Sequence, residues 1–128
     1  MKSRTLTLAA MLVAALPAWS APAADDGPML KLASSSGCLT CHHVESGAKG
    51  PDGLAPVGPA WRDVAVKYRS SAGAADQLTR TVMTGSNPYA SHWKGKVSGL
   101  AMPPNEVAIK EPDARLLVNW ILKLDPGK

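Results

Sequence analysis

Apolar residues recur at the spacing of an α-helix in four separate stretches of the chain. The most regular stretch comes last, after Pro112, a residue that suits the first turn of a helix. Its apolar stripe consists of Leu116, Leu117, Trp120, Ile121 and Leu124. A second helix is expected to begin at Pro59. The apolar side of that helix consists of Trp61, Val64, Ala65 and Tyr68.

The other two stretches are bounded by residues that start or stop helices. The first helix is expected to have Asp25 or Asp26 as its N-cap and to end at Gly37. Its apolar side consists of Met29, Leu30 and Leu32. The third helix is expected from about residue 74 to 84, with Gly85 as its C-terminal cap. Its apolar side consists of Ala75, Leu78 and Val82.

Two long segments between the helices are rich in glycine and proline. Residues 44–58 and 86–105 contain too many of these breakers to form a long regular element. No stretch alternates apolar and polar residues as a strand does, and no internal repeat is present. We therefore predict an all-α domain of about four helices, with two long loops in which a cofactor could be wrapped.

Residues 1–23 are typical of an export signal. Lys2 and Arg4 precede an apolar run, residues 6–16, that is too short to span a bilayer. Small residues then allow cleavage after Ser20 or after Ala23. An uncleaved membrane anchor is the alternative, and the shortness of the apolar run argues against it. We therefore expect an exported, periplasmic protein whose single domain is residues 24–128.

The composition of the predicted domain limits both its core and its partners. The chain has no phenylalanine, and a domain of this size buries only roughly 60–70% of the surface that its unfolded form exposes. A buried cofactor would supply the missing apolar bulk. Without Lys2 and Arg4, twelve basic residues face ten acidic residues, a net charge of +2. The sequence therefore lacks the dense basic stripe of a nucleic-acid-binding protein.

Cys38, Cys41 and His42 form the strongest chemical motif of the chain. Two cysteines separated by two residues and followed at once by histidine are the attachment motif of c-type haem. Residues one helical turn apart can direct both sulfurs to the vinyl groups on one porphyrin edge. The histidine then reaches the iron as an axial ligand. The motif predicts one haem c, bound covalently through Cys38 and Cys41.

Three alternatives for the two cysteines remain open. A thioredoxin-like redox pair would follow an apolar strand in a βαβ unit, whereas the residues before Cys38 read as a short helix. A structural zinc site needs four ligands, and His43 and His92 do not have the spacing of a zinc module. A disulfide between Cys38 and Cys41 is the third alternative, because an exported pair lies in an oxidising compartment.

The second axial ligand has five candidates in the predicted domain, which are Met29, Met83, Met102, His43 and His92. A methionine on an apolar helix face usually fills the core, which applies to Met29 and Met83. Met102 lies in a loop and precedes two prolines that favour an extended backbone. The alternative role for Met102 is to fill the core above the last helix. His43 is expected at the surface, because the iron cannot use two successive side chains from one side.

Four segments of the chain resemble the small bacterial class I cytochromes c. They are residues 38–42 (CLTCH), 57–65 (VGPAWRDVA), 85–86 (GS) and 102–105 (MPPN). The resemblance implies a helical fold wrapped around one covalent haem, with His42 and Met102 as the axial ligands. The loop of residues 44–56 is longer than in the shortest members of the family, and residues 89–99 also differ.

The same resemblance implies roles for four more residues. The backbone carbonyl of Pro59 would accept a hydrogen bond from Nδ1–H of His42. The indole N–H of Trp93 would bond a haem propionate, and Asn105 would hold the sulfur of Met102. Trp120 would pack against the first helix.

A haem iron with both axial positions filled is suited to one-electron transfer. The resemblance therefore implies a monomeric electron carrier rather than an enzyme, with transient redox partners that dock at the haem edge near Cys38 and Cys41. Lys94 and Lys96 could steer this docking. The alternatives are a cytochrome subunit of an exported oxidoreductase, such as a molybdenum sulfite dehydrogenase, and a haem sensor or catalyst with an open sixth position.

Overall fold

The computed structural model describes residues 25–126, and the predicted export signal lies outside these residues. The described chain contains four α-helices: α1 (Gly27–Ser35), α2 (Trp61–Tyr68), α3 (Ala74–Thr84) and α4 (Glu111–Lys123). Three short 3-10 turns complete the order: η1 (Cys38–Thr40), η2 (Pro51–Gly53) and η3 (Pro88–Ala90). No strand occurs between residues 25 and 126. The all-α prediction is confirmed, and α3 has the predicted bounds.

Helix α4 is the centre of the fold and contacts each of the other three helices. Its buried side is formed by Ala114, Leu117, Val118 and Ile121. The buried side of α2 is the predicted one: Trp61, Val64, Ala65 and Tyr68. The prediction for Leu116 is wrong, because its side chain is 55% exposed. Leu116 lies one residue from the line of Leu117, Ile121 and Leu124, at the edge of the stripe where no helix covers it.

Helix α1 is joined to α4 by side chains near its N-terminus. Asp25 accepts a hydrogen bond from the backbone N–H of Gly27 at 3.0 Å, so it satisfies one of the free N–H groups of the first turn. Asp26 occupies the N-cap position, and its carboxylate accepts the indole N–H of Trp120 at 2.7 Å. The edge of the Trp120 ring also meets Trp61, with centroids 5.6 Å apart. The predicted packing of Trp120 against the first helix is confirmed.

Helix α2 begins at Trp61, two residues later than predicted. Ala60 is extended (ψ 142°) and serves as the N-cap. The first N–H groups of the helix are bonded by the preceding loop: Trp61 donates to the carbonyl of His43 at 2.8 Å, and Arg62 to that of Val44 at 3.1 Å. The start of α2 therefore holds the segment that follows the Cys-x-x-Cys-His motif.

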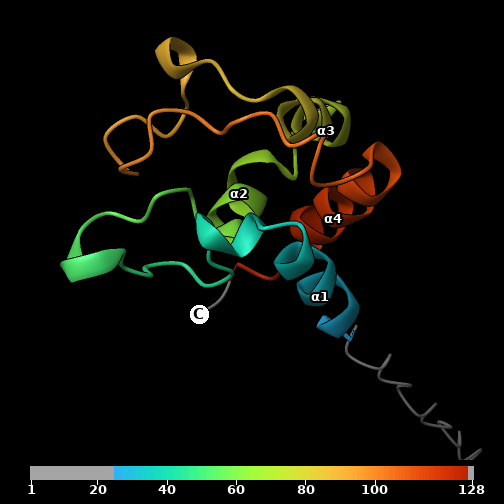
Figure 1. Ribbon diagram of the computed structural model, residues 1–128, viewed down its shortest axis with the longest axis horizontal. Helices are drawn as coiled ribbons and strands as arrows, with labels where there is room; N and C mark the ends of the chain where they lie inside the picture. The colour runs from blue at the N-terminus through green and yellow to red at the C-terminus, as the bar shows by residue number, and fades with distance from the viewer. Residues whose placement is uncertain (1–24, 127–128) are drawn as a thin grey trace, which may run out of the picture.

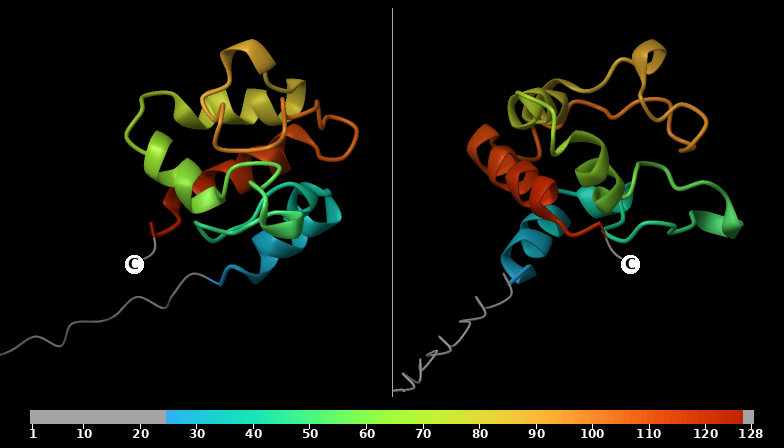
Figure 2. Two further views of the ribbon diagram at one scale, coloured as in Figure 1. Left: turned by 90° about the vertical axis from the view of Figure 1, so that its left-hand side faces the viewer. Right: turned by 180° about the vertical axis from the view of Figure 1, so that it is seen from behind.

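The two long loops project from the same side of the helical core. Figure 1 shows the loop that contains η2 and the loop that contains η3 extending away from α1 and α4, and the rear view in Figure 2 shows the same arrangement. The loops are bonded to each other where they leave the core. Ser98 donates its backbone N–H to Pro56 at 2.8 Å, and Gly99 donates to Val57 at 3.0 Å. The open side of the fold lies between these loops and the helices.

Candidate functional site

A cavity of about 450 Å³ lies between the two loops and helices α2, α3 and α4. This volume is within the range of about 300–1,000 Å³ that is usual for ligand and cofactor sites. His42 and Met102 both line the cavity, although they are sixty residues apart in the chain. Leu78 and Val82 of α3 form part of its wall, so the predicted apolar side of α3 faces the cavity. The structure thus brings the two predicted axial ligands to one largely apolar site.

The cysteine motif lies on a tight turn directly after α1. Gly37 has a φ of +73°, which turns the chain from the helix into η1. The N–H groups of Cys41 and His42 both donate to the carbonyl of Cys38, at 3.3 Å and 3.1 Å. Cys41 lines the cavity, and Cys38 packs against the buried core. Burial raises the pKa of the Cys38 thiol.

These observations bear on the alternatives for the two cysteines. Both are free thiols in the structure. The element that precedes them is a helix, whereas a thioredoxin-like pair follows a strand. Within the part of the chain that the structure describes, no three His, Cys, Asp or Glu side chains form a group that could hold a metal ion. The local fold therefore favours neither the thioredoxin-like pair nor the zinc site.

The imidazole of His42 is held from two sides. Its Nδ1 lies 2.8 Å from the carbonyl oxygen of Pro59, as the resemblance implied. Since a carbonyl can only accept, Nδ1 carries the proton and Nε2 presents a lone pair that can bind a metal. The ring also stacks on Trp61, with centroids 5.9 Å apart and an angle of 24° between the planes. Burial lowers the pKa of His42 more than the bond to Pro59 raises it, and this favours the neutral imidazole that a metal requires.

Gly58 allows the backbone to approach His42 closely. A Cβ atom at this position would lie 2.7 Å from Cε1 of His42 and 2.9 Å from Nδ1. The N–H of Gly58 also donates to the carbonyl of Cys41 at 2.8 Å. The segment of residues 57–59 therefore fits directly against His42, and any side chain at Gly58 would displace the imidazole ring.

Substitution of Gly58 tests this close fit. We expect Gly58→Ala to lower the free energy of unfolding of the haem-loaded protein by about 1–3 kcal/mol, because overpacking forces the His42 ring or the backbone to move. Denaturant unfolding followed by circular dichroism measures the effect. Gly27→Ala is the matched control, since its Cβ would meet only the end of the flexible Asp25 side chain at 3.0 Å. Equal stability of the two variants would contradict the prediction.

Met102 is held in place through its backbone. The N–H of Met102 donates to the hydroxyl of Ser86 at 2.8 Å, and the N–H of Ser86 donates to the carbonyl of Met102 at 2.9 Å. Gly85, with a φ of +83°, makes this possible, because a Cβ there would lie 2.9 Å from the Met102 oxygen. Sequence reasoning included Gly85 and Ser86 in the family pattern but did not assign this contact.

The side chain of Asn105 bonds two backbone carbonyls in the structure. Its side-chain amide donates to the carbonyls of Pro103 at 2.7 Å and Val82 at 3.2 Å. The amide has only two hydrogens, and these bonds use both. The backbone N–H of Asn105 also donates to Val82, at 3.0 Å. Asn105 therefore ties the loop after Met102 to α3, and its contact with the Met102 sulfur stays a prediction.

A polar cluster of Tyr68, His92 and Trp93 borders the cavity. The hydroxyl of Tyr68 lies 2.5 Å from Nδ1 of His92, and their rings stack with centroids 5.8 Å apart. Burial raises the pKa of Tyr68, and the neighbouring side chain of Trp93 works against this rise. His92 is exposed, and sequence reasoning missed its bond to Tyr68 because the two residues lie in separate segments.

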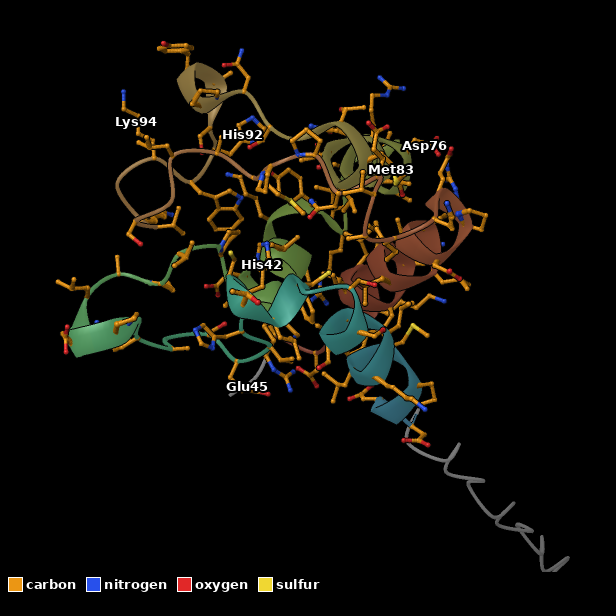
Figure 3. All side chains as sticks on the ribbon, in the orientation of Figure 1. His42, Glu45, Asp76, Met83, His92 and Lys94 are labelled. Atoms are coloured by element: carbon orange, nitrogen blue, oxygen red, sulfur yellow. The ribbon has the colours of Figure 1, made fainter. Side chains whose placement is uncertain are left out.

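The remaining candidate ligands are placed elsewhere. Met29 and Met83 pack against the hydrophobic core, as predicted for helical methionines. His43 is exposed, which also agrees with the prediction. Figure 3 shows His42 beside η1 and facing the loop that carries His92, whereas Met83 lies on α3 away from it.

Known proteins are similar to this chain in sequence and in fold. No protein-family model matches the chain. The chain is 44% identical to cytochrome c-551 of Allochromatium vinosum over 74% of this chain and 84% of that protein. It is 36% identical to cytochrome c-552 of Nitrosomonas europaea over 73% of this chain and 75% of that protein. The chain belongs to the small class I cytochromes c.

Structural comparison agrees with this assignment. The crystal structure of wild-type Nitrosomonas europaea cytochrome c552 matches with a TM-score of 0.58 at 34% identity, over 75% of this cytochrome and 99% of that chain. Cytochromes c of this kind are electron carriers rather than enzymes, and membership implies haem c as the cofactor. None of the helices between residues 25 and 126 is long and apolar enough to cross a bilayer.

Proposed function

We propose that this cytochrome is exported to the periplasm and carries single electrons between two redox proteins. One haem c would be attached through Cys38 and Cys41, with His42 and Met102 as axial ligands. When bound, this group supplies a one-electron Fe(III)/Fe(II) couple. The observation that carries the proposal is that His42 and Met102, from opposite halves of the chain, line the same cavity as Cys41.

The residues of the site suit a carrier that must not change shape between oxidation states. Pro59 and Trp61 fix the His42 ring, and Ser86 bonds both the N–H and the carbonyl of Met102. With both positions filled, oxygen and other small ligands have no ready access to the metal. Thioether ligation and an apolar pocket favour the reduced state, so the reduction potential should be high.

The polar cluster is the end of the cavity best suited to the haem propionates. Tyr68, His92 and Trp93 are the side chains there that can donate or accept hydrogen bonds. The Trp93 ring lies beside the Tyr68 ring, with centroids 6.5 Å apart, so we assign the propionate contact to the cluster rather than to Trp93 alone. Partner contacts of such a carrier are transient, with interfaces below about 1,200 Å². We expect a monomer.

Visible spectra in both redox states and the intact mass test the proposal together. We expect the mass of the processed chain plus one haem, with the chain beginning at Ala21 or Ala24. We also expect the weak ferric band at the red end of the spectrum that is typical of methionine ligation. A mass without haem would contradict the covalent attachment. Absence of the ferric band, together with rapid carbon monoxide binding, would contradict the assignment of Met102.

A further inference from the structure

A second cavity, of about 510 Å³, lies beside the first on the outer side of α2. We call it the lysine groove. It is lined from three segments: the loop of residues 44–56, the exposed side of α2, and residues 93–97 of the other loop. Pro59, Trp93 and Val97 line both cavities. The lysine groove is therefore separated from the proposed haem site by a single layer of residues.

The charge of the lysine groove is positive. Lys49, Lys67 and Lys96 line it, and Asp63 is the one acidic residue among its lining residues. Asp63 accepts a hydrogen bond from the hydroxyl of Ser46 at 2.5 Å, which ties it to the adjoining loop. Between residues 25 and 126, the ion pairs are those of Arg62 with Glu45 and of Arg115 with Asp76 and Glu111. The three groove lysines take part in none of them.

Apolar surface accompanies these charges. Val66, on the outer side of α2, is 57% exposed and lines the groove. The ammonium group of Lys67 lies 5.6 Å from the centroid of the Trp93 ring, so this lysine is held over the wall shared with the haem site. Lys96 lines the groove, whereas Lys94 extends from the projecting loop as Figure 3 shows.

The walls of the lysine groove are held by bonds within the chain. Arg62 of α2 donates two hydrogen bonds to Glu45 of the loop, from Nε to Oε2 at 2.8 Å and from Nη2 to Oε1 at 3.0 Å. The backbone bonds from residues 98 and 99 to residues 56 and 57 join the two loops. A preformed site loses less entropy on binding than a flexible one. The longer loop, in which this chain departs from the shortest class I cytochromes, therefore forms a defined wall.

We propose that the lysine groove docks an acidic surface segment of a redox partner. Complementary charge steers such encounters and sets the register of the complex, and the three unpaired lysines match a segment rich in Asp or Glu. The shared wall places the bound segment beside the haem site. This surface is distinct from the haem edge near Cys38 and Cys41, and the inference rests on the proposed electron-carrier function.

The test uses the haem-loaded, ¹⁵N-labelled protein, a short oligoglutamate peptide as probe and oligoglutamine as its uncharged control. We expect oligoglutamate, and not oligoglutamine, to shift the NMR signals of the Trp93 indole and of residues 47–49 and 96–97 at low salt. The triple variant Lys49→Glu, Lys67→Glu, Lys96→Glu should weaken binding by about tenfold or more. The triple variant Lys49→Gln, Lys67→Gln, Lys96→Gln should weaken it by less.

The matched control is Lys31→Glu, Lys110→Glu, Lys123→Glu, three exposed lysines outside the groove whose reversal changes the net charge equally. It should weaken binding by less than about threefold, because only long-range attraction is lost. Equal weakening in both charge-reversal variants would overturn the proposal. So would NMR shifts centred on Leu39 and Leu100, which are exposed apolar residues outside the groove. A visible spectrum of each protein separates the two hypotheses. If the wild type has an intact haem spectrum but does not bind oligoglutamate in the groove, the docking proposal is wrong and the carrier function stands. If the wild type has no haem spectrum, the carrier function is wrong.

Discussion

Replacing Cys38 and Cys41 together by serine should yield a chain that lacks covalent haem and most of its helical far-UV circular dichroism signal. Many of the buried hydrophobic residues have small side chains. Five of the thirteen are alanines: Ala33, Ala60, Ala65, Ala74 and Ala114. The side chains of Leu78 and Val82 pack against the core on one side and line the 450 Å³ cavity on the other. Without a cofactor in that cavity, α3 would expose these residues to water, and a domain of this size has little stability to lose.

Comparison with the haem-loaded wild type by far-UV circular dichroism and thermal unfolding measures this effect. The double variant Ser34→Ala, Ser35→Ala is the matched control, because both serines are exposed in the segment just before the motif and lie outside the cavity. We expect the control to retain haem and a cooperative transition. A haem-free chain with a native-like helical spectrum would show that the protein core is sufficient on its own.

Replacing Met102 by leucine should leave haem attached but abolish the ferric band of methionine ligation. Leucine has nearly the same volume as methionine, so packing is largely conserved while the thioether is lost. We expect the reduction potential to fall by on the order of 0.1 V or more, since axial ligands set haem potentials over a range of about 0.8 V. Carbon monoxide should bind the reduced protein faster, because one axial position opens.

Met83→Leu is the matched control for Met102→Leu. Met83 packs against the core, so its replacement should change the free energy of unfolding by less than about 1.5 kcal/mol and leave the spectrum and potential unchanged. An unaltered spectrum in Met102→Leu would instead favour the alternative in which Met102 only fills space above the last helix. Visible spectroscopy and redox titration of the two variants distinguish these outcomes.

Leu116 and Asn105 both have surroundings that local spacing did not indicate. Leu116 belongs to the apolar stripe of α4 by spacing, but no other helix covers its position, and its side chain is 55% exposed. Asn105 matches the family pattern, yet its amide hydrogens are used by Pro103 and Val82. In both cases the residue type and its local spacing were read correctly, and the partner that decides its role comes from the arrangement of neighbouring segments.

Local features of the chain could be determined from the sequence alone. The bounds of α3, the buried side of α2 and the absence of strands between residues 25 and 126 follow from helical spacing and from Gly and Pro breakers, because these act within one or two turns. The Cys-x-x-Cys-His motif is equally local. It therefore predicted the cofactor and one ligand without any knowledge of the fold.

Only the tertiary structure decided which distant segments meet. Three sets of hydrogen bonds connect parts of the chain that no local pattern relates. They join Ser86 to Met102, Tyr68 to His92, and residues 56–57 to residues 98–99. These contacts shape the haem cavity and create the lysine groove beside it. Their physical origin is the packing of α4 against the other three helices, which determines where each loop leaves the core and therefore which loops can bond.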